Sequence, residues 1–209
     1  MAFHSPPPPE QLSSRERLLD AAIRLFGQNG FEGTSVRAIG DEAGVSWALI
    51  RFYFGSKEGV REAADERAIR GYLDAVHKGH SASSYEQLAS MLEVDAKGLS
   101  ETAGYLRRAI LEERPIALDF LRQLLETTEV ENAALRAEYP DEPVLWDPVR
   151  QIVQRMGYLL LAPQILTLSG RDVFSTEELK RRNEIAFRSG RLLREGLRAE
   201  RRDPSKKKN

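Results

Sequence analysis

The chain has 209 residues, a length that suits one large or two small domains. Hydrophobic residues make up 41% and charged residues 30%, and no apolar run reaches the roughly 18–20 residues of a membrane-spanning helix. The absence of cysteine excludes disulfides and thiolate chemistry. The 31 basic and 32 acidic residues nearly cancel, which excludes coating of nucleic acid through bulk charge but permits local basic contacts.

The N-terminal residues predict an unstructured arm followed by a helix. The proline run Pro6–Pro9 indicates a disordered or polyproline-II arm over residues 1–11. This segment lacks the basic and apolar regions of a signal peptide, so we expect a cytoplasmic protein. Ser13 and Glu16 have capping-box spacing and are expected to open an amphipathic helix that ends at Gly30.

Residues 35–54 predict two short helices joined by a tight turn. Val36, Ile39 and Ala43 recur at spacings of three and four, as one apolar helix face requires. Gly44 then supplies the backbone freedom that a sharp turn needs. This pattern is a helix-turn-helix.

The second of these helices has an unusual outward face. Ser46 can cap it, and Ile50 and Phe54, which lie four apart, are expected to face inward. The other side chains are too large and too apolar for an ordinary solvated face: Trp47, Ala48, Leu49, Arg51, Phe52 and Tyr53. Such a face is typical of a helix that reads the DNA major groove.

Residues within and around this motif resemble those of a known family. They are LFGQNGFEGTSV at 25–36, Ile39, AGVS at 43–46 and FGSKEG at 54–59. Residues 12–72 thus resemble the N-terminal DNA-binding domain of the TetR family of transcriptional regulators, with the helix-turn-helix at 35–54. Arg51 stands where this family usually has tyrosine, and Trp47 where a small polar or basic residue is common.

The chemistry of this surface suggests a role for each side chain. Arg51 can bridge guanine O6 and N7 with two hydrogen bonds, or instead clamp a phosphate or pair with Glu58. Leu49 and Ala48 could meet thymine methyl groups, although Leu49 could also pack against the first helix.

Aromatic and phosphate-binding groups complete the predicted interface. Tyr53 and Trp47 suit phosphate contact with sugar packing, whereas Phe52 could equally pack against the first or fourth helix. Ser35 can cap its helix and bind a phosphate, and Lys57 resembles the family's phosphate-contacting lysine. The full set expected at DNA is Thr34, Ser35, Arg37, Ser46, Trp47, Ala48, Leu49, Arg51, Phe52, Tyr53 and Lys57.

The remainder of the chain shows only helical periodicity, so we predict an all-α fold with a larger helical domain at residues 73–200. Candidate helices are Tyr85–Val94, Thr102–Leu111, Ile116–Tyr139 with a break near Thr127, one ending near Leu168, and one opened by Ser175 and Glu178. The resemblance implies an effector-binding domain whose last two helices pair with a second subunit as a four-helix bundle.

Small-molecule binding is expected from the resemblance rather than from a motif. Residues that could line an effector pocket, although each is more often core, are Tyr105, Phe120, Leu124, Trp146, Met156 and Tyr158. The basic tail at 201–209 could add phosphate contacts or remain solvated.

We therefore expect a homodimeric, ligand-responsive repressor of transcription that binds a palindromic double-stranded DNA operator and uses no cofactor. One alternative is a helical adapter that uses the same face on a protein partner. Another is a metal enzyme built on His77 and His80, which lie three apart but lack an evident third ligand and could equally be solvated. The sequence contains no phosphate loop or nucleophile elbow, so we do not expect an enzyme.

Overall fold

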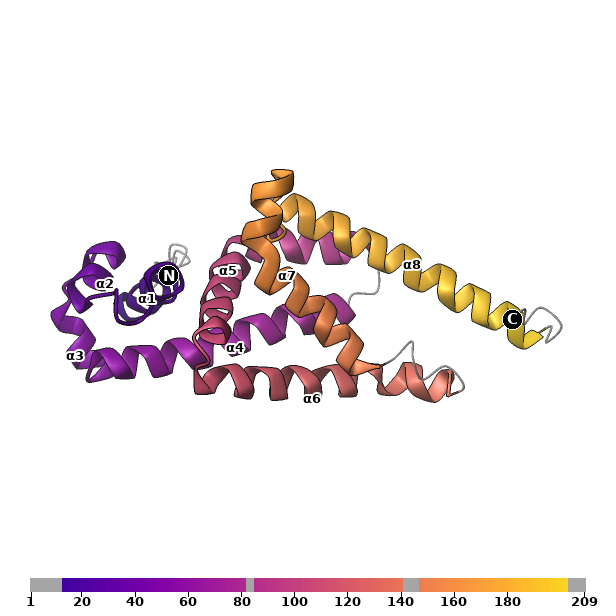
Figure 1. Cartoon of the computed structure of the whole chain (residues 1–209), viewed down its shortest axis with the longest axis horizontal. Coiled ribbons are helices and arrows are strands. Elements are labelled where there is room, and N and C mark those ends of the chain that lie inside the picture. The colour runs from indigo at the N-terminus through magenta and orange to yellow at the C-terminus, as the bar shows by residue number, and fades with distance from the viewer. Residues whose placement is uncertain (1–12, 82–84, 141–146, 203–209) are drawn as a thin grey trace, which may run out of the picture. The chain divides into compact units, whose positions relative to one another are not determined.

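The computed structural model describes residues 13–81, 85–140 and 147–202, and in these ranges it contains helices and turns but no strand (Figure 1). The helices are α1 (Ser14–Asn29), α2 (Val36–Ala43), α3 (Ala48–Phe54), α4 (Lys57–Ser81), α5 (Tyr85–Leu111), α6 (Pro115–Glu138), α7 (Pro148–Ser169) and α8 (Thr176–Arg202). The predicted all-α class is confirmed. The proline-rich arm and residues 203–209 of the basic tail lie outside the described residues. No helix in the described ranges has the length and apolarity needed to cross a bilayer.

The chain divides into two compact units. Unit 1 comprises residues 1–73 and 101–124, and unit 2 comprises 74–100 and 125–209. Unit 1 therefore contains α1 to α3, the first part of α4, the end of α5 and the start of α6. The helix-turn-helix, which ends at Phe54, thus shares its compact unit with a segment that begins only at Glu101.

Two predicted helix boundaries inside the larger domain are wrong. The segments expected as separate helices at 85–94 and 102–111 form the single helix α5, and α6 continues without a break through Thr127. The residues between the two predicted α5 segments include Gly98 but no proline, and one glycine costs a helix only about 1 kcal/mol. The break in α6 was expected from Thr127 and Thr128, but Thr128 is buried and its hydroxyl accepts a hydrogen bond from Arg155 at 2.7 Å.

The helix α1 forms the core of unit 1. Its predicted capping box is present, because Ser13 Oγ accepts from the Glu16 backbone N–H and the Glu16 carboxylate accepts from the Ser13 N–H. The apolar face that this cap orients is buried and comprises Leu18, Leu19, Ala21, Ala22, Ile23 and Phe26. The same unit also buries apolar residues of the later helices, namely Ile39, Ile50, Val60, Ala64 and Ala68.

A polar cluster within unit 1 joins α4 to the end of α5. The buried Tyr105 donates its hydroxyl to Asp65 at 2.5 Å, and Arg114 donates to the same carboxylate oxygen at 2.6 Å. Burial, followed by the Asp65 charge, raises the pKa of Tyr105, so its hydroxyl remains a donor. Tyr105 also packs against Phe26, which connects this cluster to the core of α1.

The turn between α2 and α3 depends on two glycines. Gly44 has φ 65°, a left-handed conformation, and its N–H is bonded to the carbonyl of Asp41 at 3.1 Å. Gly40 lies directly against the start of α3, because a Cβ at this position would approach Trp47 backbone atoms to 2.8–2.9 Å. The two helices therefore meet closely at a position where only glycine fits.

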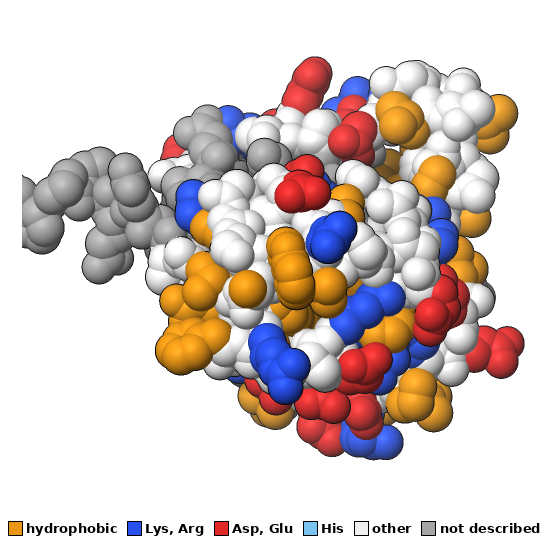
Figure 2. Space-filling model, turned by 90° about the vertical axis from the view of Figure 1, so that its left-hand side faces the viewer, with side chains coloured by type: hydrophobic (Ala, Val, Ile, Leu, Met, Phe, Trp, Pro, Cys, Tyr) orange, Lys and Arg blue, Asp and Glu red, His pale blue; other side chains and the backbone are white. Residues whose placement is uncertain are grey.

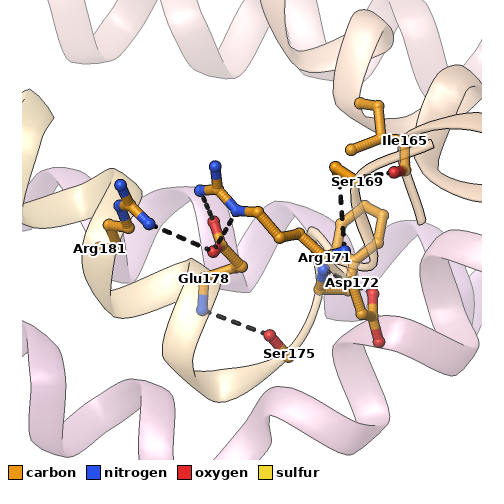
Figure 3. Close-up of polar contacts among 8 residues, drawn as sticks. Ile165, Ser169, Arg171, Asp172, Ser175, Glu178 and Arg181 are labelled. Carbon is orange, nitrogen blue, oxygen red and sulfur yellow. Dashed lines mark hydrogen bonds and ion pairs between the residues drawn. The ribbon is translucent and has the colours of Figure 1, made fainter. Parts of the chain in front are cut away.

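In unit 2, a salt bridge stabilises the turn that joins α7 to α8 (Figure 3). Arg171 donates two hydrogen bonds, of 2.6 and 2.5 Å, to the Glu178 carboxylate, and the Glu178 N–H donates to Ser175 Oγ at 3.3 Å. Ser175 thus caps α8 as predicted. The hydrogen bond from Arg171 is the main reason that the pKa of Glu178 lies below its ordinary value.

The Gly40 contact predicts that Gly40→Ala lowers the free energy of unfolding by about 1–3 kcal/mol, because the added methyl group meets backbone rather than a movable side chain. Gly71→Ala is the matched control, since a Cβ there meets only Thr102 Oγ1 at 3.8 Å. In the middle of α4 that change should stabilise by about 0.5–1 kcal/mol. Urea denaturation of both variants checks the pair, and equal effects would contradict the close contact at Gly40.

Candidate nucleic-acid interface

The helix α3 buries one side chain and exposes most of the others. Ile50 is 3% exposed, whereas Phe52 is 78%, Trp47 47% and Tyr53 37% exposed. The predicted inward position of Ile50 is confirmed, and Phe54, also predicted inward, is half-buried beneath the Arg15 guanidinium at 5.1 Å. The expected outward face of this helix therefore exists in the folded unit.

This face combines apolar and aromatic side chains with one cation. Ala48 and Arg51 are exposed and Leu49 is half-buried. Phe52 and Tyr53 pack edge to face with their ring centroids 5.0 Å apart. On the side of the molecule that carries α2 and α3, hydrophobic side chains gather beside Lys and Arg side chains (Figure 2). Apolar groups for base edges and cations for phosphates are thus available on one surface.

Two neighbouring residues at the start of α2, both predicted to contact DNA, differ in their exposure. Ser35 is exposed, and its Oγ accepts from the Ala38 N–H at 3.1 Å, so it caps α2. Thr34 is buried, and its hydroxyl donates to the Gly30 carbonyl at 2.8 Å at the end of α1. The Thr34 side chain therefore braces the connection between α1 and α2 and does not reach the exposed surface.

The tryptophan at the start of α3 supports a neighbouring arginine. The Arg37 guanidinium carbon lies 5.6 Å from the centroid of the Trp47 ring, within range of a cation–π contact. Ser46 is exposed, and its Oγ accepts from the Ala48 N–H at 3.4 Å. Trp47 is the boundary residue of α3, one position later than the predicted cap at Ser46.

The start of α4 presents a second group of cations. Ser56 caps this helix through the Gly59 N–H at 3.1 Å. Lys57 Nζ lies 4.1 Å and the Arg61 guanidinium carbon 4.5 Å from the centroid of the Phe31 ring. Hydrogen bonds from its own backbone and from Ser56, helped by the charges of Arg61 and Lys57, lower the pKa of Glu58.

Sequence reasoning missed three members of this surface: Arg15, Phe31 and Arg61. Arg61 follows Lys57 by four residues and so shares its helix face, a signal that was available in the sequence. The contacts of Arg15 with Phe54 and of Phe31 with both cations join segments distant in the chain, and only the folded structure reveals them.

The residues predicted for an effector pocket belong to different units. Tyr105, Phe120 and Leu124 lie in the core of unit 1 and are at most 1% exposed. Met156 and Tyr158 are half-buried in unit 2, and Trp146 lies outside the described residues.

Two side-chain contacts in unit 2 bear on the predicted small-molecule and metal sites. The Arg182 guanidinium carbon lies 4.1 Å from the centroid of the Tyr158 ring. His77 Nδ1 lies 3.6 Å from a carboxylate oxygen of Glu131. Within the ranges that the structure describes, no group of three His, Cys, Asp or Glu residues is placed to hold a metal ion.

The geometry of α2, the glycine turn and α3 defines a helix-turn-helix domain of the DNA-binding class. Residues 18–64 match the family model described as "Bacterial regulatory proteins, tetR family". Over these residues the chain matches the TetR family of transcriptional regulators.

Two curated relatives are named as HTH-type transcriptional regulators. The HTH-type transcriptional regulatory protein RaaS of Mycobacterium tuberculosis is 34% identical over 136 residues, which cover 64% of this chain and 58% of RaaS. The probable HTH-type transcriptional regulator YttP of Bacillus subtilis is 29% identical over 120 residues, covering 56% of this chain and 58% of YttP. The chain thus matches less than two thirds of either relative.

Solved structures extend the likeness of fold beyond the N-terminal unit. A transcriptional regulator from Aquifex aeolicus VF5 matches with a TM-score of 0.57 and 20% identity, covering 84% of this chain and 98% of that one. A regulator from Saccharomonospora viridis, crystallised with choline, matches with a TM-score of 0.50 and 18% identity, covering 83% and 95% of the two chains. These relatives are regulators rather than enzymes, and at such identities the structures show a shared fold alone.

Because Thr34 is buried and Ser35 is exposed, we expect substitutions at these two positions to have different effects on stability. Thr34→Val should lower the free energy of unfolding by about 1–3 kcal/mol, because it leaves a buried carbonyl at the end of α1 without its donor. Ser35→Ala should cost about 1 kcal/mol through loss of the α2 cap and should also weaken any phosphate contact. Thermal denaturation of both variants is the measurement. A Thr34→Val protein with wild-type stability would contradict the bracing role.

Proposed function

We propose that this protein is a one-component transcriptional regulator that binds a palindromic operator in double-stranded DNA as a homodimer and acts as a ligand-responsive repressor. The observation that carries the proposal is the exposed face of α3, where Ile50 alone is buried while large apolar side chains and Arg51 face outward. Such a face gains from insertion into the major groove, where base edges and thymine methyl groups offer matching contacts. A regulator of this kind acts in the cytoplasm, where bacterial DNA lies.

The proposed DNA contacts are of two kinds, contacts to base edges and contacts to the sugar-phosphate backbone. Arg51, Ala48, Leu49 and Phe52 are proposed to face base edges, since they project from the exposed side of α3. Residues at the starts of α2, α3 and α4, together with Tyr53 near the end of α3, are proposed to contact phosphates and sugars: Ser35, Arg37, Ser46, Trp47, Tyr53 and Lys57. Thr34 contributes indirectly, because its buried hydroxyl fixes the backbone from which Ser35 projects.

Exposed apolar stripes on α7 and α8 support the proposed dimer. On α7, Val149, Val153, Leu161 and Leu168 recur at helical spacings, and they are 53–87% exposed. On α8, Ile185 and Leu192 lie seven residues apart and are 57% and 64% exposed. Large apolar side chains left exposed along one helix are typical of a protein–protein interface. In a dimer, two α3 helices could enter successive major grooves about 34–36 Å apart.

A small-molecule effector is proposed to bind unit 2 and to release the operator by favouring one spacing of the two α3 helices. Met156 and Tyr158 are the proposed contacts, because their side chains are only half-buried. The Saccharomonospora viridis neighbour, crystallised in complex with choline, is an example of a protein of similar fold that binds a small molecule.

A binding-site selection on genomic DNA fragments tests the proposed readout. Arg51→Ala should weaken the preferred site by roughly 1–3 kcal/mol and relax the sequence preference at one base pair of each half-site. Lys57→Ala should instead weaken binding to all DNA sequences alike. It should also reduce the slope of log affinity against log salt concentration by about 1, as expected for the loss of one phosphate contact. An Arg51→Ala protein that selects an unchanged motif would contradict base readout by Arg51. Binding to a protein partner with no salt-dependent DNA binding would favour the adapter alternative.

Sedimentation equilibrium tests the proposed dimer. Val153→Asp or Leu192→Asp should raise the dimer dissociation constant at least tenfold, because each removes an apolar side chain worth about 1.5–3 kcal/mol when buried. Val130→Asp on α6 is the matched control, since Val130 is 76% exposed but lies outside the proposed interface. Equal weakening by all three changes, or by none, would contradict an interface made by α7 and α8.

A further inference from the structure

Phe31, in the turn that follows α1, holds two cations against one ring. Lys57 Nζ lies 4.1 Å and the Arg61 guanidinium carbon 4.5 Å from its centroid, both well inside the roughly 6 Å range of a cation–π contact. All three side chains are half-buried, so part of each remains accessible from solvent. Lys57 and Arg61 also lie one helical turn apart on the same face of α4.

We propose that Phe31 is a positioning residue for phosphate binding, and that it holds Lys57 and Arg61 together as one two-cation site for the DNA backbone. The proposal rests on the DNA-binding function put forward above and adds two residues to it, one of them a cation. The ring takes only one side of each cation, so the remaining N–H donors are free to meet phosphate oxygens.

The ring can perform this role because it is itself anchored. Phe31 packs against Phe26 with their centroids 5.4 Å apart, and Phe26 is 2% exposed in the core of unit 1. Phe26 packs in turn against the buried Tyr105. The Phe31 ring is therefore fixed by the core. A lysine or arginine that packs against this ring samples fewer rotamers than one that is isolated on a helix surface.

Holding the cations in advance affects DNA affinity in a defined way. Two like charges one turn apart on a helix repel, and the negative face of the ring offsets that repulsion before DNA arrives. When a phosphate binds both cations, Lys57 and Arg61 then lose less conformational freedom than two mobile side chains would. The gain is independent of base sequence, because phosphates carry no base identity.

The same pairing recurs on this surface, which supports a common role. Arg37 lies 5.6 Å from the Trp47 ring centroid and Arg15 lies 5.1 Å from that of Phe54. The pair at Phe31 is the tightest of these contacts, with both cations within 4.5 Å. It is therefore the pair for which removal of the ring should have the largest effect.

The test measures the affinity of the full chain for a fluorescein-labelled random-sequence DNA duplex of about three helical turns, over a series of salt concentrations. Phe31→Leu, which retains an apolar side chain against Phe26 but removes the ring face, should weaken binding about 5- to 30-fold. Phe31→Tyr retains the ring face and should bind within about twofold of the wild type. Thermal unfolding of each variant identifies any loss of fold.

A double-mutant cycle separates positioning from general packing. In a Lys57→Met/Arg61→Met background, Phe31→Leu should change affinity by less than about twofold, because the cations that it positions are gone. An undiminished loss in that background would overturn the proposal, as would tighter binding by Phe31→Leu, which would mean that ring and phosphate compete. A wild-type protein without salt-dependent binding would refute the proposed function and this inference together, whereas normal wild-type binding with an unaffected Phe31→Leu refutes only the inference.

Discussion

The close approach of α2 to the start of α3 is the constraint on which the candidate DNA surface depends. Gly40 allows the α2 backbone to meet Trp47, and Gly44 reverses the chain between the two helices. With α3 fixed in this way, Ile50 reaches the core and the remaining faces of this short helix turn outward. The exposure of its aromatic residues is therefore a consequence of packing in unit 1 rather than a sign of incomplete folding.

A nearly neutral chain can bind a polyanion when its cations are held in place. The protein has 31 basic and 32 acidic residues, so attraction through net charge is absent. On the surface of unit 1, however, Arg15, Arg37, Lys57 and Arg61 each lie against an aromatic ring. Cations held in this manner need fewer compensating contacts, because less conformational freedom is lost when a phosphate binds. Cations held in fixed positions can thus replace a high net positive charge as the source of phosphate binding.

The sequence predicted the local features of the fold and missed the distant ones. Helix starts at Ser13 and Ser35 and the glycine turn at Gly44 follow from capping and backbone rules that act within a few residues. The sequence did not predict the continuity of α5, because a single residue such as Gly98 lowers helix stability by only about 1 kcal/mol, which is too little to end a long helix.

The candidate site shows the same division. The outward set on α3 follows from the four-residue spacing of Ile50 and Phe54, whereas the burial of Thr34 depends on a hydrogen bond back to α1. The cations on Phe31 depend on a turn that precedes α4 by more than twenty residues. The chemical class of an effector depends on a cavity shape that residue types alone do not specify.

Fluorescence of Trp47 tests the central claim most directly. In a Trp146→Phe variant Trp47 is the sole tryptophan, because the chain contains two. If the exposed face of α3 enters DNA, added duplex should shift Trp47 emission and protect the indole from acrylamide quenching, and raising the salt concentration should reverse both effects. Unchanged emission and quenching, in a protein that is shown by anisotropy to be bound to DNA, would contradict the account by locating the interface elsewhere.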